Sequence, residues 1–454
     1  MFQKLRKLLS QIDADFADIR YEIMKETFLN LTGKELSRID TNTTDGYVLR
    51  ILKNGGFSSI SFTQPTDAEK AIKTAMQNAE LLSKNLDKPI ALAKTPQIKA
   101  NVVLQLQDDP RKIPLAEKLE LLRKYNDIPL SYEKIVMTYL GYSETFRKKY
   151  YLNSAGSEIS EELLTTRIGG SLTSKEGNLT QNLGISSGGS NGFNSIRNLE
   201  DLFEKRSGIA LDLLKAEPIS GGIYNCILNP SLSGVFAHEA FGHFSEADII
   251  ETLPAMRKKM QLGAKLGNDT LSITDNATLP DQLGFYRYDD EGVAVRKVEL
   301  MKNGVLTGRL HSRRTAQEFN EPVSGHCVAE DYKYAPIIRM GTIFIESGKN
   351  SFEDLMDQLD NGLYIIDAKG GQTSGENFTF GAQYGFKVKN GKKAGMIRDI
   401  NMSGNLYSTL KEITSVGNDL LLSKTGGCGK GQLNIRSCHG GPHILMKNVV
   451  IGGI

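Results

Sequence analysis

The chain has 454 residues, enough for two or three domains with buried cores, and its composition excludes several classes of protein. Charged residues make up 24% of the chain and the net charge is +2, with no block of like charges that would bind nucleic acid directly. No apolar run approaches the ~20 residues that span a bilayer. With four scattered cysteines and no export signal, we expect reduced thiols and a cytoplasmic protein without membrane contact.

Strands and helices alternate in the first half. The turn residues Asn54-Gly55-Gly56 predict a hairpin between strands Tyr47–Lys53 and Phe57–Phe62. The other predicted strands are Ile19–Arg38, with a turn at Thr32-Gly33-Lys34, Ile135–Thr145, and a strand that starts at Tyr150. The predicted helices are Thr66–Lys84, Leu115–Tyr125 and Leu199–Lys215. Gly184–Asn194 is rich in glycine and serine, which predicts a flexible loop near a substrate path.

A domain boundary is expected at Pro218, because the segments that follow are mostly strands. Short β-prone runs separated by glycine turns predict strands at Ile223–Leu228, Ala294–Leu300, Ile337–Ile345, Tyr364–Ala368 and Tyr384–Val388, with a helix at Phe352–Asp360. The sequence therefore predicts an α+β protein. A mixed α/β N-terminal domain at 1–217 is followed by a β-rich C-terminal domain at 218–454, which carries the helix described next.

The motif His238-Glu239-Ala240-Phe241-Gly242-His243 lies in a segment, Pro230–Asp248, that is predicted to be helical. Imidazoles bind zinc and related ions, and a neighbouring glutamate is typical of metallopeptidases. Histidines five residues apart diverge by about 140° on a regular α-helix, so one metal ion cannot bind both. We therefore predict a π-type turn near Phe241-Gly242, where the helix widens and the two rings converge.

A metal ion would need a further ligand, and the residues alone leave several candidates. Glu246 and Asp248 follow the motif closely, although both fit better as polar groups at the helix end. Cys428 is flanked by glycines and followed by a lysine two residues later, which would help keep a thiolate charged, although the residues alone slightly favour a buried apolar thiol. Cys438, His439 and His443 form a second metal-like cluster that also fits an ordinary turn.

Other catalytic templates fit poorly. Two Gly-x-Ser-x-Gly matches lie within 184–192, without the strand and helix of a nucleophile elbow. Gly429-Lys430 lacks the remaining residues of a phosphate-binding loop. His326 and Cys327 are neighbours on a predicted strand and so face opposite sides. Asp289-Asp290-Glu291-Gly292 lacks the alternating ligands of a calcium loop and is predicted to be a turn.

The chain resembles the TldD/PmbA family, whose members have also been described as modulators of DNA gyrase, and specifically its TldD-type metallopeptidase subunit. The resemblance rests on these motifs: His238–Asp248, Asp289–Gly292, Lys302–Leu306, Gly370-Gly371, Val416–Asp419, Gly427–Lys430 and Val450–Gly453. It implies that His238, His243 and Cys428 bind one divalent metal ion, with zinc expected, and that Glu239 is the general base.

The resemblance also implies a function and partners. The expected activity is hydrolysis of unfolded or short peptides, with the site enclosed by a homodimer or a heterodimer with a PmbA-type chain. The alternative is a non-catalytic modulator or peptide-binding subunit, which would have no need of Glu239. The stretch Ser324–Glu330 departs from the family pattern, as does the cluster Cys438–His443, so the physiological substrate stays open.

Overall fold

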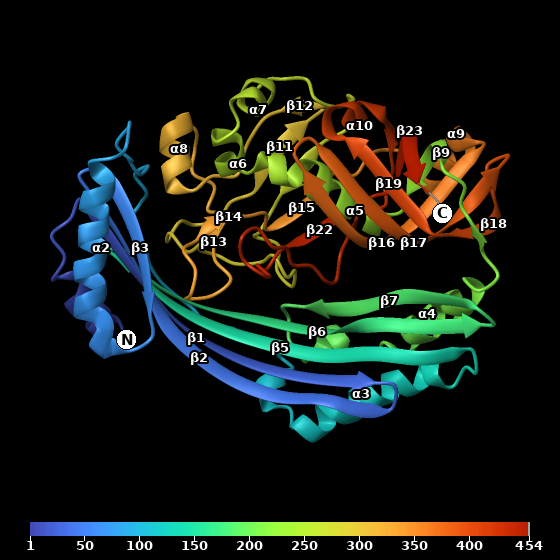
Figure 1. The fold of residues 1–454 in the computed structure, drawn as a ribbon, viewed down its shortest axis with the longest axis horizontal. Helices are drawn as coiled ribbons and strands as arrows, with labels where there is room; N and C mark the ends of the chain where they lie inside the picture. The colour runs from blue at the N-terminus through green and yellow to red at the C-terminus, as the bar shows by residue number, and fades with distance from the viewer. Residues whose placement is uncertain (453–454) are drawn as a thin grey trace.

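The computed structural model describes residues 1–452, and its first half is built on one long curved sheet (Figure 1). The sheet has the order β3-β2-β1-β5-β6-β4, with β7 paired to β6. Its strands are β1 Phe16–Thr32, β2 Glu35–Lys53, β3 Gly56–Phe62, β4 Lys99–Val102, β5 Ile135–Asn153, β6 Glu158–Glu176 and β7 Leu179–Gly189. The α-helices of this half are α1 Phe2–Leu9, α2 Ala68–Ser83, α3 Leu115–Leu130 and α4 Glu200–Asp212, with short 3₁₀ helices at Pro65–Asp67, Pro110–Lys112 and Phe193–Ile196.

Helices cover this sheet where its strands carry apolar side chains. α3 packs on β5 and α4 packs mainly on β6 and β7. The two helices also contact each other, and the rings of Tyr125 and Phe203 stack with centroids 5.0 Å apart. α2 packs on β2 and β3, where Ala75 and Ala79 are fully buried. Gly56 lies so close to this helix that a Cβ atom there would stand 1.9 Å from the carbonyl oxygen of Ala79. The spacing of small residues on α2 therefore fixes how closely the helix approaches the hairpin.

The second half contains two larger sheets and a two-stranded ribbon. The eight-stranded sheet consists of β8 Glu217–Pro218, β9 Gly222–Leu228, β16 Gly362–Ser374, β17 Asn377–Lys389, β18 Lys392–Arg398, β19 Ile400–Asn405, β20 Ile413–Val416 and β23 Ile444–Gly452. The six-stranded sheet consists of β10 Ile273–Asp275, β11 Val298–Lys302, β12 Val305–Leu306, β15 Thr342–Ile345, β21 Leu421–Leu422 and β22 Cys438–Gly441. The ribbon pairs β13 Cys327–Val328 with β14 Ile337–Ile338.

The helix α5 Pro230–Phe236 packs against strands of both larger sheets, including β16 and β22. The remaining helices are α6 Ala247–Glu251, α7 Pro254–Lys259, α8 Arg313–Phe319, α9 Phe352–Leu359 and α10 Leu406–Glu412. One large apolar core joins the helix to both sheets, and Phe236 lies at its centre, with its ring edge-on to those of Phe378 and Phe380. The residues after α5 are thus held on a rigid, buried element. Within residues 1–452, no helix is both long and apolar enough to cross a membrane.

The α+β class is confirmed, and most predicted elements of the first half are present. The hairpin around Asn54-Gly55 and the turn at Gly33 join β1, β2 and β3 as predicted. The prediction of a flexible loop at Gly184–Asn194 is wrong for its first part, because Gly184–Gly189 belongs to β7 and pairs with β6. These glycines lie in a ladder of backbone hydrogen bonds that stabilises the strand without help from side chains.

In the second half, two predicted strands differ from the structure. Ala294–Arg296 is not part of a strand, since β11 begins only at Val298, and the run Ile337–Ile345 contains two short strands in different sheets. The segment 339–341 separates them, and Gly341 has no room for a side chain, because a Cβ atom would lie 2.3 Å from that of Ala277. Apolar composition predicted strands here but did not reveal the break.

Buried ion pairs join the first-half sheet to the turn Asp289–Gly292 of the second half. Asp290 accepts hydrogen bonds from Arg147 at 3.0 Å, from Lys149 at 3.1 Å and from the backbone N–H of Ala329 at 2.8 Å. All these side chains are buried, and the cationic partners hold the pKa of Asp290 well below its usual range, although burial opposes this. The segment is a turn, as predicted, and its carboxylates bind the strands of the first sheet.

Replacing Asp290 should therefore destabilise the protein strongly. Asp290→Ala removes one of the two carboxylates that each buried cation contacts, leaving Arg147 with Glu22 and Lys149 with Glu161. Breaking such a buried ion pair typically costs about 3–5 kcal/mol in the free energy of unfolding. Urea denaturation followed by circular dichroism measures the change. Asp40→Ala, at an ion pair with exposed side chains, is the matched control and should change stability little. Equal stability losses in the two variants would show that the buried network does not hold the two halves together.

Candidate metal centre

The chain between Pro230 and Ser245 changes its helical pitch twice. α5 begins after Asn229, whose side-chain oxygen accepts a hydrogen bond from the backbone N–H of Leu232 at 3.0 Å. An α-helix to Phe236 is followed by a π-helix at Ala237–Phe241 and a 3₁₀ helix at Gly242–Ser245. The predicted local widening is therefore confirmed, and it begins one residue before His238.

The widened turn brings the two histidine rings together. The ring centroids of His238 and His243 are 5.1 Å apart and their planes are perpendicular, whereas a regular helix would separate the side chains by about 140°. Gly242 has a φ of −56°, which any residue can adopt, so conformational freedom is not the reason for a glycine here. The reason is the space around it. A Cβ atom at Gly242 would lie 2.1 Å from the sulfur of Met340, so a side chain there would push the turn away from the core.

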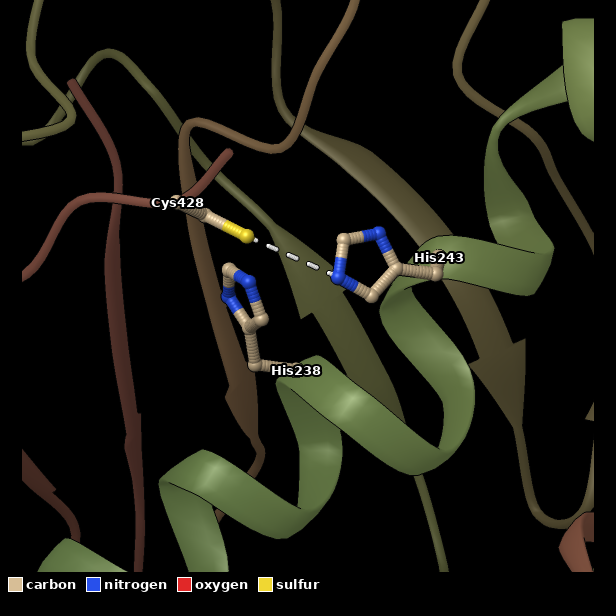
Figure 2. Close-up of side chains that lie close together, drawn as sticks. All are labelled: His238, His243 and Cys428. Carbon is tan, nitrogen blue, oxygen red and sulfur yellow. Dashed lines mark hydrogen bonds between the residues drawn. The ribbon is translucent and has the colours of Figure 1, made fainter. Parts of the chain in front are cut away.

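Cys428 reaches the histidines from the other end of the chain (Figure 2). Its Sγ lies 3.6 Å from Nε2 of His243, and one donor atom from each of His238, His243 and Cys428 lies within 4.8 Å of the others. The backbone of Cys428 exchanges two hydrogen bonds with Ile435, of 3.1 and 3.0 Å. Within residues 1–452 this is the only group of at least three His, Cys, Asp or Glu side chains arranged to bind one metal ion.

Electrostatics distinguish the two histidines. Burial holds the pKa of His238 well below its usual range, so the ring is neutral, and its Nδ1 has no hydrogen-bond partner in the described chain. Burial also opposes the charged form of His243, but hydrogen bonds to Cys428 and Glu246 outweigh it and raise the pKa to about 9. Two imidazoles and a thiol fit the ligand set of a borderline-soft divalent ion such as zinc. The unpartnered buried nitrogen of His238 agrees with such a ligand role.

Glu239 lies beside this group and is oriented by β16. Its Oε2 is 3.7 Å from Nε2 of His243 and accepts a hydrogen bond of 3.1 Å from the hydroxyl of Thr373. Gly371 on the same strand passes so near that a Cβ atom there would be 3.3 Å from Cγ of Glu239. Glu239, His243 and Cys428 all line an open cavity of about 640 Å³. A substrate in this cavity can reach the carboxylate and the metal-binding group together.

Glu246 and Asp248 are close to the centre but serve other partners. Lys430 donates to Glu246 at 2.8 Å and to Asp248 at 3.0 Å, and Arg339 lies 3.3 Å from Glu246. Burial would raise the pKa of Glu246, but Arg339, Lys430 and His243 lower it to about 2. The lysine two residues after Cys428 therefore attaches its loop to the histidine-bearing segment through these carboxylates.

The cluster Cys438–His443 does not form a metal-binding group among the residues that the structure describes. Cys438 is buried and donates to the carbonyl oxygen of Ser423 at 3.1 Å. His443 lies between Asp419 and Tyr364, at 2.5 and 2.9 Å. His439 alone approaches the centre, with its ring centroid 6.1 Å from that of His238. Its pKa is lowered to about 4 by burial, so it is a neutral neighbour of that ring.

Comparison with known proteins places the chain in a family. Three domain models, described as PmbA/TldA metallopeptidase domain 1, central domain and C-terminal domain, match residues 17–79, 108–215 and 221–453. A metalloprotease from Synechocystis sp. is 32% identical over 446 residues, which cover 98% of this chain and 96% of the relative. The chain belongs to the PmbA/TldD metallopeptidase family.

Further relatives and solved structures agree with this assignment. A protein named zinc metalloprotease TldD homolog, from Saccharolobus solfataricus, is 27% identical and matches over the whole of both chains. A proposed modulator of a DNA gyrase from Thermotoga maritima has a TM-score of 0.81 at 19% identity and covers both chains fully. TldE from Thermococcus kodakarensis has a TM-score of 0.77 at 18% identity, with 99% and 98% coverage. At these identities the two structures show the shared fold alone.

Sequence reasoning missed several residues around the centre. Thr373, which holds Glu239, lies 134 positions away in a strand with no distinguishing motif. Arg339 is fully buried beside Glu246, and no local pattern predicts a buried arginine. Lys430 was noted only for its charge near Cys428, while its contacts with Glu246 and Asp248 depend on the tertiary fold.

Proposed function

We propose that this family member is a metal-dependent peptidase that hydrolyses unfolded or short peptides. His238, His243 and Cys428 would bind one divalent ion, zinc, and Glu239 would act as the general base. The observation that carries the proposal is the approach of all three donor atoms within 4.8 Å, with the carboxylate of Glu239 in the same open cavity. The bound ion would supply Lewis acidity and lower the pKa of water at this position.

The residues of the chain would then do the following work. Glu239 accepts the proton of the attacking water and passes it to the leaving amine, which requires an ionised carboxylate held in one orientation. Thr373 supports that orientation, since its hydroxyl lies 2.7 Å from the backbone carbonyl oxygen of Glu239 and 3.1 Å from Oε2 of its carboxylate. The apolar side chains Phe244, Leu253 and Met256 line the same cavity and limit the access of bulk water.

The cavity wall also favours an extended substrate. Gly371–Ser374 of β16 pairs with β17 on one side, while the described part of the chain places no strand on its other side, because β9 pairs only with Leu363–Ile365. A peptide can bind to such a free edge through its main chain, with little dependence on side chains. This supports unfolded or short peptides as the substrate class.

We further propose a two-domain division at residues 217 and 218, and a dimer that encloses the cavity. The domain proposal rests on the sheets, since β1–β7 form one sheet and the later strands, beginning with β8 Glu217–Pro218 across the boundary itself, pair only with strands of the second half. The partner would be a second copy or a PmbA-type chain, in line with the family resemblance, and a cytoplasmic location fits the free cysteines. The alternative of a non-catalytic modulator has weaker support, because binding alone would not need Glu239 at this position.

Removal of metal tests the proposal. The purified chain, alone and with a PmbA-type partner, should contain about one metal ion per chain and cleave an unfolded peptide, measured by mass spectrometry. Chelation should abolish cleavage, and zinc should restore it, since the bound ion would polarise the scissile carbonyl and activate the water. A chain that retains metal yet cleaves no unfolded peptide under either condition would favour the modulator.

A further inference from the structure

A second cavity, of about 820 Å³, lies next to the metal centre, between the first sheet and the second half of the chain. Its floor is formed by four neighbouring strands, β1, β5, β6 and β7. Glycines stand at several positions of this floor, and neighbouring side chains fill the space that a Cβ atom would need: Asn30 lies 2.7 Å from that position at Gly141 and Gln383 lies 3.1 Å from it at Gly184. The long strands of the first sheet run beneath the second half of the chain (Figure 1).

The ionic side chains that line this cavity are mostly cationic. They are Arg167, Arg206, Lys424 and Asp367. Arg206 and Asp367 form an ion pair at 2.5 Å and so neutralise each other. Arg167 and Lys424 are left as two positive charges with no carboxylate among the other lining residues. The cavity therefore attracts anions.

Arg167 is the more specific of the two cations. Its one hydrogen bond in the described chain runs from Nη1 to the carbonyl oxygen of Gly426 at 3.1 Å, so its other donors are free. Burial lowers its pKa, and the neighbouring thiol of Cys438, whose own pKa is raised to about 11, carries no charge at neutral pH to compensate it. A half-buried guanidinium with free donors matches the two oxygens of a carboxylate.

The cavity is adjacent to the proposed reaction site. The carbonyl that Arg167 contacts belongs to the second residue before Cys428. His439, whose ring centroid is 6.1 Å from that of His238, lines the same cavity. The 6.1 Å between these two rings corresponds to about two residues of an extended peptide, which advances about 3.3 Å per residue.

We propose that Arg167 binds a carboxylate of the substrate peptide and thereby determines which peptides are preferred. The carboxylate belongs either to an Asp or Glu side chain or to the C-terminus, and both present the same chemistry to the guanidinium. The inference deepens the proposed peptidase function and rests on it for the identity of the ligand as a substrate. Arg167 would act as a specificity residue, separate from Glu239 and the metal ligands.

Binding of three labelled peptides tests the proposal. All are N-acetylated and alike except for their anionic group: one has an internal Asp and an amidated C-terminus, one has Asn and a free C-terminus, and one has Asn and an amidated C-terminus. Fluorescence anisotropy gives the Kd for the full chain carrying Glu239→Gln, so that the peptides stay intact, and again after chelation. Arg167→Gln is compared with Arg123→Gln, an exposed arginine on α3, in the same background.

Arg167→Gln should raise the Kd of at least one carboxylate-bearing peptide by roughly tenfold to a hundredfold, and that of the neutral peptide much less. The peptide that responds identifies the source of the carboxylate, and Arg167→Lys should give an intermediate value. Equal weakening of all three peptides, or none, would overturn the proposal, as would an absence of binding to the parent chain. If the difference in Kd between the Arg167→Gln and Arg123→Gln variants persists after chelation, carboxylate binding does not depend on the metal. An absence of peptidase activity would then contradict only the proposed function.

Discussion

Glu239→Gln is expected to lower the rate of peptide hydrolysis by ~10²–10⁴-fold, because loss of general-base assistance has this effect. The substitution keeps the size of the side chain and its hydrogen bond with Thr373 but removes the proton acceptor. Metal content should stay unchanged, since Glu239 is not one of the three donor residues. Cleavage of an unfolded peptide, followed by mass spectrometry alongside metal analysis, measures both quantities.

Glu69→Gln is the matched control, because Glu69 is exposed on α2, away from the centre. It should retain both full activity and metal. Cleavage by the Glu239→Gln variant at a rate near that of the parent would show that Glu239 has a structural role. A parallel loss of metal would instead mean that the carboxylate contributes to binding the ion.

Cys428→Ser and His238→Ala should each lower the affinity for zinc by more than roughly a hundredfold, because each removes a proposed ligand, and replacing a residue that only hydrogen-bonds to a ligand already costs about 10–100-fold. Competition with a chromophoric chelator measures the affinity. Activity should fall together with metal content, in contrast to Glu239→Gln.

Cys438→Ser provides the control for the thiol, since Cys438 is a buried cysteine in the same tail and lies outside the donor group. Its zinc affinity should remain close to that of the parent. If Cys438→Ser lost zinc while Cys428→Ser kept it, the cluster Cys438–His443 would be the ligand source and the assignment of Cys428 would be wrong.

The shape of the histidine segment could be predicted from its sequence because the spacing itself conflicts with a regular helix. Two histidines five residues apart converge only if a turn widens, and the structure has a π-helix at Ala237–Phe241. The reason for a glycine at position 242 could not be predicted from the local sequence. Gly242 is required by the sulfur of Met340, a residue almost a hundred positions away, and such contacts leave no local pattern.

The position of Cys428 was predictable only by resemblance. Glycines and a lysine around a cysteine are consistent with either a ligand or a buried thiol, and Cys438 has a similar setting in sequence. The structure separates them through the hydrogen bonds with Ile435 and the contacts of Lys430 with Glu246 and Asp248. These hold the loop of Cys428, and not that of Cys438, beside His243.

Composition misled the prediction for the strand β7. A stretch of glycine and serine reads as a loop, because neither residue favours a strand by itself. In the structure Gly184–Gly189 pairs with β6 throughout, and Gly184 and Ser186 line the cavity of about 820 Å³ that also contains Arg167 and Lys424. Gly184 has little room for a side chain, because a Cβ atom would lie 3.1 Å from the side-chain amide of Gln383. This contact depends on the second half of the chain and is not visible locally.

The most direct test of the metal centre is a crystal structure of the zinc-loaded chain with anomalous difference maps at the zinc edge. The account predicts one peak bonded to His238, His243 and Cys428, with a Zn–S distance of about 2.3 Å and Zn–N distances of about 2.0–2.1 Å. A peak among Cys438, His439 and His443, or a zinc ion at the histidines without the sulfur of Cys428, would contradict it.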